Sequence, residues 1–332
     1  MRRLKAEWEY QNVVLMALPH KNTDWVGVGL EEARAVFRKI AQAIGYWQMV
    51  YLLVDDVKEA KKDFCSTHNI IFIKAKFNDT WTRDYGPLSI EEDGAKKLLD
   101  FTFNGWGGKF EASLDNQINS FLHNKGFFGK SAMEHIDLEL EGGAIESDGA
   151  GAVLTTKSCL LNPNRNGGLS QKEAETLLKQ HLGATRVLWI ENSYLEGDDT
   201  DGHIDMLARF VSKDTIAYIK CEDSQDSHYK SLLEMEKELK HLKQTNGAPY
   251  NLVPLPFPEA KYKDDFRLPA SYANFLITNK SVLFPTYQSP KDKEAQTVFK
   301  KLFPDKEIIP IPCLKLIEQG GSLHCSTMQI TF

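Results

Sequence analysis

The chain has 332 residues, of which 42% are hydrophobic and 26% are charged, and its formal net charge is −6. This length and composition predict a folded protein with a large core and exclude a disordered chain. The small acidic excess disfavours a nucleic-acid-binding protein, since that class is more often basic. No run of about 18 apolar residues occurs, so the sequence predicts no contact with a membrane.

The cysteines predict a reducing compartment. An odd, scattered set of five in a chain of this length does not form a disulfide framework. No CxxC pair occurs, so the sequence gives no support for a structural zinc site. The first ten residues lack the apolar segment of a signal peptide. We therefore expect a cytoplasmic protein.

Strand-like and helix-like segments alternate along the chain, and no low-complexity linker divides it. This alternation predicts an α/β fold, with one domain over residues 1–332. In chain order, the expected elements are a strand at Asn12–Leu18, a helix at Glu31–Tyr46, a strand at Val50–Val54, and helices at Ser170–His181 and Tyr229–Leu242.

Five further segments read as related hairpin units, most clearly the middle three, in which a turn joins two apolar strands. Their openings are separated by 57, 62, 71 and 51 residues. This period predicts one ββαβ-type unit repeated about five times, which can close into a ring with the strand ends near its axis. The segments are Trp81–Ile90, Glu141–Thr155, Gly202–Ile219, Ser271–Thr286 and Gly320–Ile330, with openings at Asp84, Glu141, His203, Asn274 and Cys325.

Two motifs bring reactive groups together. Cys325 follows Gly320-Gly-Ser-Leu-His, which suggests a nucleophilic thiolate on a tight turn, although a buried structural cysteine is the alternative. The segment Gly197-Asp-Asp-Thr-Asp-Gly-His-Ile-Asp packs four carboxylates and one imidazole into nine residues. On a strand, His203 and Asp205 would point to the same face and act on one ligand. A solvated acidic loop or a divalent-metal loop is the alternative, although EF-hand spacing is absent.

Three other segments suggest a pocket for a cation. Glu141 precedes two glycines, which fits either a carboxylate facing a pocket or the start of a hairpin. Asp84 and Trp81 offer an anion beside an aromatic face, which suits a planar cation, unless Arg83 simply neutralises Asp84. The glycine-rich segment Asn104–Lys109 is expected to be an exposed, mobile loop, and whether it acts as a lid is open.

Together these motifs resemble those of agmatine deiminases, which belong to the guanidino-group-modifying superfamily, and related bacterial peptidyl-arginine deiminases share part of the pattern. The likeness runs from about residue 6 to residue 330. The motifs, in order, are Trp-x-Arg-Asp-x-Gly-Pro, Asn-Gly-Trp-Gly-Gly-Lys, Leu-Glu-Gly-Gly, Cys159-Leu-Leu-x-x-Asn-Arg-Asn, Gly-Asp-Asp-Thr-Asp-Gly-His-x-Asp and Gly-Gly-x-x-His-Cys-x-Thr-x-Gln.

The resemblance implies a five-bladed, pseudo-symmetric α/β propeller, the pentein fold, as a single catalytic domain that needs no metal or organic cofactor and forms a homodimer. It implies that Cys325 is the nucleophile and His203 the acid/base. Departures at Gln319, Gly167 and Met328 leave the shape of the loop near Cys325 open. The other implied site residues are Asp84 and Asp205, which would grip the guanidinium, with Glu141 beside them, and Asp199 and Trp81 as substrate contacts.

The resulting prediction is a cysteine-dependent deiminase that hydrolyses a small cationic guanidino substrate. Agmatine would give N-carbamoylputrescine and ammonia through a covalent thiouronium intermediate on Cys325. Asp198 and Asp199 favour agmatine, because the carboxylate of arginine would need a cationic partner that the sequence does not place. The alternatives are an arginine or peptidyl-arginine deiminase, a cysteine hydrolase acting on an amide, and a non-catalytic polyamine-binding protein.

Overall fold

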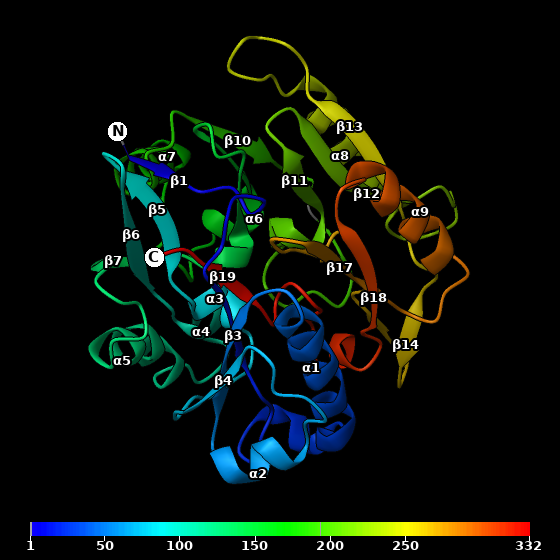
Figure 1. The fold of residues 1–332 in the computed structure, drawn as a ribbon. Coiled ribbons are helices and arrows are strands. Elements are labelled where there is room, and N and C mark those ends of the chain that lie inside the picture. Colours follow the sequence, from blue (N-terminus) through cyan, green and yellow to red (C-terminus); the bar gives the residue numbers. More distant parts are fainter. Residues whose placement is uncertain (1, 193) are drawn as a thin grey trace.

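The fold consists of separate small sheets, as the computed structural model shows for residues 2–192 and 194–332 (Figure 1). Five of the sheets share one pairing pattern, in which an antiparallel pair of strands is extended by a parallel strand. A parallel neighbour requires a crossover connection, and a helix fills each crossover. The predicted mixed α/β fold is confirmed, although no sheet closes on itself within the described residues.

The strands of these sheets alternate with helices along the whole chain. The five sheets are β1 (Arg2–Leu4), β5 (Leu88–Glu92), β6 (Ala95–Thr102) and β7 (Ala132–Glu139); β8 (Ile145–Ser147), β9 (Ala152–Thr156) and β10 (Arg186–Ile190); β11 (Ala208–Ser212), β12 (Thr215–Lys220) and β13 (Asn251–Pro256); β16 (Leu276–Ile277), β17 (Ser281–Thr286) and β18 (Glu307–Pro312); and β19 (Met328–Ile330), β2 (Val13–Ala17), β3 (Met49–Val54) and β4 (Ile70–Lys74). A sixth is the hairpin of β14 (Lys261–Lys263) and β15 (Phe266–Leu268).

The helices are short, and α1 is the longest at 16 residues. Within the described residues, none combines the length and the apolar character needed to cross a membrane. The helices are α1 (Leu30–Gly45), α2 (Val57–Lys62), α3 (Thr82–Tyr85), α4 (Gly105–Gly108), α5 (Ile118–Asn124), α6 (Lys157–Leu160), α7 (Gln171–Leu182), α8 (Tyr229–His241) and α9 (Asp292–Leu302).

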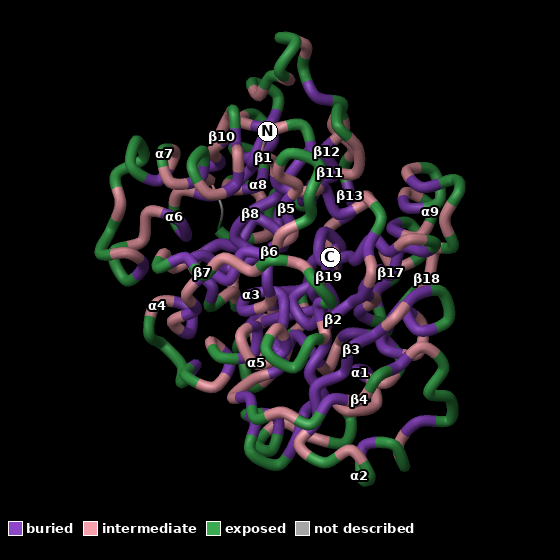
Figure 2. Tube along the Cα trace, turned by 60° about the vertical axis from the view of Figure 1, so that its left-hand side comes forward, coloured by how far each residue is buried: buried purple, intermediate pink, exposed green. Residues whose placement is uncertain are grey.

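The core lies between the sheets and the helices that cover them (Figure 2). All five residues of β2 are buried, as expected for a strand that has neighbours on both edges and is covered on both faces. Helix α1 is amphipathic and buries Phe37, Ile40 and Ile44 on its inner side. Each such side chain contributes about 1.5–3 kcal/mol to stability through apolar burial.

The five elements expected from apolar patterning are confirmed, with boundaries that differ by about one residue. They correspond to β2, α1, β3, α7 and α8. Local chemistry sets the ends of α7. Ser170 and Glu173 form a capping box at its start, and Gly183 ends it with a φ of 68°.

The three middle hairpins are also confirmed, as β8–β9, β11–β12 and β16–β17. The first and last predicted units differ from hairpins. The first segment opens with helix α3, and its strand β5 pairs with β6 beyond the predicted end. The last contains only β19, whose antiparallel partner is β2 from the start of the chain. The two chain ends therefore complete one sheet, which apolar patterning within a single segment does not reveal.

Candidate active site

Every proposed catalytic residue lies just ahead of a strand that belongs to the antiparallel pair of its sheet. Asp84 lies in α3 before β5, and Glu141 precedes the 3₁₀ turn Gly142–Ala144 that leads into β8. His203 caps the 3₁₀ turn Ile204–Met206 before β11, and Cys325 lies just before β19. Each of these residues occupies the same place in its own unit, directly before a strand. The residues therefore lie close together in the fold, as the repeat spacing predicts. The prediction that His203 and Asp205 lie on a strand is wrong, because His203 caps this 3₁₀ turn and Asp205 lies within it.

Three of the groups converge on Gly143. A Cβ atom added to this glycine would lie 2.6 Å from His203 Nδ1, 2.8 Å from Asp84 Oδ1 and 3.2 Å from Asp205 Oδ2. Residues from two other units, the first and the third, therefore surround one backbone position of the second. Only glycine leaves room for them, which gives a physical reason for the Leu-Glu-Gly-Gly motif.

The carboxylate of Asp84 is held by two donors. Its Oδ1 accepts from the backbone N–H of Gly143 at 3.0 Å, and its Oδ2 accepts from Trp106 Nε1 at 2.9 Å. Burial, together with the nearby carboxylate of Asp205, raises the pKa of Asp84 to about 6. The alternative in which Arg83 neutralises Asp84 is wrong, because Arg83 points to the backbone oxygen of His324 and to Glu7.

Asp205 lies directly beside the proposed nucleophile. Its Oδ2 is 2.7 Å from His324 Nδ1, 3.2 Å from Asn274 Nδ2 and 3.9 Å from Cys325 Sγ. Burial opposes ionisation, but the hydrogen bond and charge of His324 lower the pKa of Asp205. Its Oδ1 is buried and has no hydrogen-bond partner among the described residues. This oxygen is therefore available to a guanidinium N–H.

The thiol of Cys325 is almost completely buried, with 6% of the residue exposed. Asn274 Nδ2 donates to Sγ at 3.2 Å, and the backbone N–H of Cys325 approaches Asn274 Oδ1 at 3.4 Å. Burial, followed by the charges of Asp205 and Asp84, raises the pKa of the Cys325 thiol well above its ordinary value. The resting group is therefore the neutral thiol.

His203 is enclosed by acids. Its Nδ1 lies 3.7 Å from Asp84 Oδ1, and neither ring nitrogen has a hydrogen-bond partner in the part of the chain that the structure describes. Burial opposes the charged form, but the carboxylate of Asp84 raises the pKa of His203 well above its ordinary value. The imidazolium can therefore give up a proton to a bound group.

Glu141 is fixed by a cation that the sequence could not place. Arg165 is fully buried and donates through Nε to Glu141 Oε1 at 2.7 Å. The same guanidinium donates to Asp201 Oδ2 at 2.7 Å and to the backbone oxygen of Thr200 at 3.0 Å. The acidic segment that contains Asp201 is therefore partly neutralised from within the protein.

A pocket opens over these groups, and it encloses about 400 Å³ of space free of protein atoms, part of it open to solvent. Trp81, Asp84, Asp199 and Cys325 line it, whereas His203, Asp205 and Glu141 lie outside its lining. The remaining lining residues are acidic, aromatic or small, except for one glutamine: Asp24, Asp79, Trp106, Phe110, Thr200, Gln319, Gly320 and Gly321. Such walls suit a ligand that is planar and cationic.

The two glycines before Cys325 allow the backbone to approach the pocket walls closely. A Cβ atom on Gly321 would lie 2.6 Å from the ring of Trp81, and one on Gly320 would lie 2.8 Å from Asp199 Oδ1. Gly320 also has a φ of 78°, a conformation that favours glycine. The predicted tight turn ahead of Cys325 is confirmed.

The glycine-rich segment Asn104–Lys109 is seated on the site, so the expectation of an exposed loop is wrong for its tryptophan. Trp106 is buried and contacts Asp84, as given above. Lys109 Nζ donates to the backbone oxygen of Asp199 and lies 2.8 Å from Asp201 Oδ1. The sequence missed these contacts because they depend on how the loop folds back over another unit.

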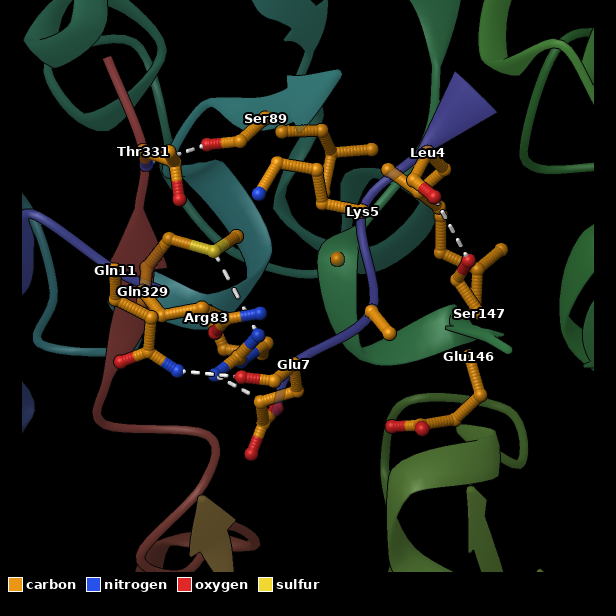
Figure 3. A pocket seen from close by; sticks show the side chains of 15 residues that line it. Leu4, Lys5, Glu7, Gln11, Arg83, Ser89, Glu146, Ser147, Gln329 and Thr331 are labelled. Atoms are coloured by element: carbon orange, nitrogen blue, oxygen red, sulfur yellow. Dashed lines mark hydrogen bonds and ion pairs between the residues drawn. The ribbon is translucent and has the colours of Figure 1, made fainter. Parts of the chain in front are cut away.

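A second pocket has Arg83 in its lining but none of the proposed catalytic residues (Figure 3). Its wall carries Glu7, Arg83 and Glu146, and Arg209 pairs with both glutamates, lying 2.8 Å from Glu7 Oε2. His324 joins this cluster to the site, because its Nε2 lies 2.7 Å from Glu7 Oε2 while its Nδ1 contacts Asp205. These cations therefore stabilise the core and do not face the pocket that Cys325 lines.

Asn274 and His324 are the contact residues that sequence reasoning left without a role. Asn274 opens the fourth repeat, so its position in the period was the signal that places it beside Cys325. His324 directly precedes Cys325, but its two-sided contact depends on Glu7 from the opposite end of the chain.

Known proteins and a protein-family model match this chain over nearly its whole length. A family model described as Porphyromonas-type peptidyl-arginine deiminase matches residues 3–331. A Legionella pneumophila protein named "Putative agmatine deiminase" is 36% identical over 330 residues, which cover 98% of this chain and 94% of that protein.

Two solved structures are similar as well. The "Putative Arginine Deiminase" from Porphyromonas gingivalis superposes with a TM-score of 0.95 at 46% identity, covering 99% of this chain and 98% of the other. A C. jejuni agmatine deiminase, a Cys-to-Ser variant with substrate bound, gives a TM-score of 0.93 at 39% identity, covering 99% and 96%. The chain therefore belongs to the Porphyromonas-type peptidyl-arginine deiminase family.

Proposed function

We propose that the protein hydrolyses agmatine to N-carbamoylputrescine and ammonia, with Cys325 as the nucleophile. The observation that carries this proposal is the position of Cys325 Sγ, 3.9 Å from Asp205 Oδ2 and in the same acidic, aromatic pocket as Asp84. Two carboxylates beside a thiol suit a guanidinium carbon, because they bind its N–H groups and hold it against the sulfur. The agmatine deiminase names of similar proteins support the same reaction.

In the first half of the reaction, the bound cation favours loss of the Cys325 proton to solvent. The thiolate then adds to the guanidinium carbon and forms a neutral tetrahedral adduct. The imidazolium of His203 gives its proton to one amino group, which leaves as ammonia. The product of this half is a cationic thiouronium group on Cys325.

In the second half, the neutral imidazole of His203 takes a proton from water as the water oxygen adds to the same carbon. Collapse of this adduct breaks the carbon–sulfur bond, and the departing sulfur takes up the hydroxyl proton. The ureido product is released with the Cys325 thiol restored. Asp84 and Asp205 hold the cation throughout, and Glu141 is proposed to orient His203.

The charges around the pocket favour agmatine over free arginine. The α-carboxylate of arginine would need a cationic partner, and among the described residues that line the pocket there is no arginine or lysine. Lys109, near its rim, is already engaged by oxygens of Asp199 and Asp201. The four arginines considered from sequence, Arg83, Arg165, Arg209 and Arg267, all form ion pairs with other acids.

A substrate panel tests the proposal. The purified protein is incubated with agmatine, arginine, an arginyl peptide and an ordinary amide ester, and ureido product and ammonia are measured. We expect product from agmatine, abolished in Cys325→Ala and His203→Ala. Turnover of the peptide or the ester in preference to agmatine would contradict the substrate assignment, and binding of agmatine without any product would contradict catalysis.

We expect the Cys325 thiolate to form mainly when a cation enters the pocket. A positive charge within about 4 Å offsets the acids that raise the thiol pKa, and the interaction is large at reduced dielectric. The thiolate ultraviolet absorbance of wild-type protein, corrected with Cys325→Ser, is titrated with and without an unreactive cationic analogue of agmatine. The analogue should lower the titration midpoint by at least about one pH unit. An unchanged midpoint would contradict substrate-assisted ionisation.

Agmatine binding is expected to weaken below pH 6 through Asp199. Burial and the neighbouring Asp198 raise the pKa of Asp199 to about 6, so this carboxyl becomes neutral as the pH falls through that value. We propose that ionised Asp199 partners the distal ammonium of agmatine. KM should therefore rise as the pH falls from 7 to 5.

The substitution Asp199→Asn tests the origin of this dependence. It should raise KM at pH 8 roughly tenfold, which is the loss of one charge-assisted hydrogen bond, and should reduce the change in KM near pH 6 to the part contributed by Asp84, whose pKa is also about 6. Asp265→Asn, in the exposed turn between β14 and β15, is the matched control. A KM that keeps its full pH dependence in Asp199→Asn would rule out this assignment.

We also propose that the five sheets with the shared pairing pattern are the blades of a five-bladed α/β propeller of the pentein type, forming one catalytic domain over residues 1–332. The reaction needs no metal or organic cofactor, since cysteine, histidine and carboxylates supply each step. We further propose that the protein forms a homodimer and is located in the cytoplasm. Light scattering of the purified protein and fractionation of the source cells test these two points.

A further inference from the structure

Cys159 is a fully buried thiol that the proposed reaction does not use. It lies in the first turn of α6, close to the side chains of Glu141 and His203. The sulfur of Cys159, one carboxylate oxygen of Glu141 and one ring nitrogen of His203 all lie within 4.8 Å of one another. Three different types of metal-binding atom are thus gathered at one buried point.

Two of these residues have unused binding capacity directed at that point. Both ring nitrogens of His203 and the Oε2 atom of Glu141 are buried without a hydrogen-bond partner in residues 2–192 and 194–332. Buried polar atoms are nearly always paired, so three unpaired atoms at one site require an explanation. A cation that accepts one lone pair from the imidazole and one from Oε2 accounts for two of them, and the other ring nitrogen of a metal-bound imidazole carries a proton.

The donor set selects the chemistry of that group. Thiolate, imidazole and carboxylate together suit Zn²⁺, whereas Mg²⁺ and Ca²⁺ prefer oxygen ligands. Zinc ligands lie roughly 2.0–2.3 Å from the ion, so in a tetrahedral site they are about 3.3–3.8 Å apart. Atoms that lie within 4.8 Å of one another therefore need to approach by about 1.5 Å at most to reach this spacing.

The surroundings of Glu141 suit this role. Arg165 Nε holds the Oε1 atom at 2.7 Å, which leaves Oε2 directed away from the ion pair. Such contacts behind a ligand fix its orientation and are typical of metal sites. Three protein ligands leave a fourth position for water.

We propose that Glu141, Cys159 and His203 form a binding site for a thiophilic divalent cation such as Zn²⁺, and that its occupancy inhibits the enzyme. The inhibitory part rests on the proposed function, because it requires His203 as the acid/base. An ion on the imidazole takes the lone pair that the second half of the reaction needs, and it removes the proton that the first half needs. The ion is therefore an inhibitor of the deiminase and not its cofactor.

Binding is tested without reference to activity, with Co²⁺ as the probe. Full-length protein is titrated with Co²⁺, and the thiolate-to-cobalt charge-transfer absorption is recorded. We expect this absorption in wild-type protein, in Cys325→Ser and in Cys313→Ser, a buried cysteine outside the cluster. It should be lost in Cys159→Ser, whose fold is checked by circular dichroism.

Inhibition is measured as the Zn²⁺ concentration that halves each variant's own metal-free rate with agmatine. Cys159→Ser should raise this concentration at least tenfold, Cys313→Ser should leave it unchanged, and a chelator should restore wild-type activity. Cobalt absorption that is lost in Cys325→Ser but kept in Cys159→Ser would contradict the proposed metal site, because Cys325 would then be the residue that binds the ion. Co²⁺ absorption in a protein that does not turn over agmatine would leave the site standing while contradicting the proposed function.

Discussion

Replacing Cys325 by serine is expected to lower kcat for agmatine by at least about 1,000-fold, or ~4 kcal/mol in activation free energy. A serine hydroxyl is a much weaker nucleophile than a thiolate, and the acids around it oppose its ionisation. The side chains that hold the cation are unchanged, so the affinity for agmatine should stay within about threefold. Steady-state ammonia release gives the rate, and calorimetric titration gives the affinity.

Cys65→Ser is the matched control, since it makes the same chemical change at an exposed cysteine. Its kcat should equal that of the wild-type protein. A Cys325→Ser variant that keeps more than a tenth of wild-type turnover would show that the sulfur is not the nucleophile. A folded variant that loses agmatine binding entirely would show instead that Cys325 is chiefly a binding residue.

The substitution His203→Gln is expected to reduce kcat by about 100- to 10,000-fold, the range for loss of a general acid/base. Glutamine fills similar space but has no group that gains or loses a proton near neutral pH, so both proton transfers are lost. The structure favours a strong effect, because the unpaired nitrogens of His203 lie beside Asp84, which raises the pKa of the ring. KM should change much less than kcat, because Asp84 and Asp205 still hold the cation.

His68→Gln, at an exposed histidine, controls for the substitution itself. Circular dichroism and thermal melting establish that His203→Gln is folded. A folded His203→Gln variant with more than a tenth of wild-type kcat would contradict the assigned acid/base. A pH profile of kcat that is lost in the variant together with its rate would support it.

Much of the architecture can be predicted from the sequence because apolar periodicity reports burial directly. The run Val13–Ala17 is wholly apolar and becomes a buried strand, and the apolar positions of Leu30–Gly45 fall on one side of a helix. The repeat spacing also marked Asp84, Glu141, His203, Asn274 and Cys325 as equivalent positions. The contacts of Asn274 with Cys325 and of Gly143 with three site residues agree with that equivalence.

The remaining features depend on tertiary contacts that no local pattern encodes. Strand periodicity placed His203 and Asp205 on one face, but a 3₁₀ turn brings them together instead. Local sequence patterns also failed to predict the contact of Trp106 with Asp84, because the glycine-rich loop that carries Trp106 was expected to be exposed. The pairing of Arg165 with Glu141 spans 24 residues, and composition alone leaves several acids as candidate partners.

The central claim is a covalent bond between Cys325 Sγ and the guanidinium carbon of the substrate. Wild-type protein is mixed with agmatine, quenched in acid within one turnover, digested and analysed by mass spectrometry. We predict a thiouronium adduct on the peptide that contains Cys325, absent in Cys325→Ser. Product formation by the wild-type protein with no adduct at any quench time, or with the adduct on another cysteine, would contradict the account.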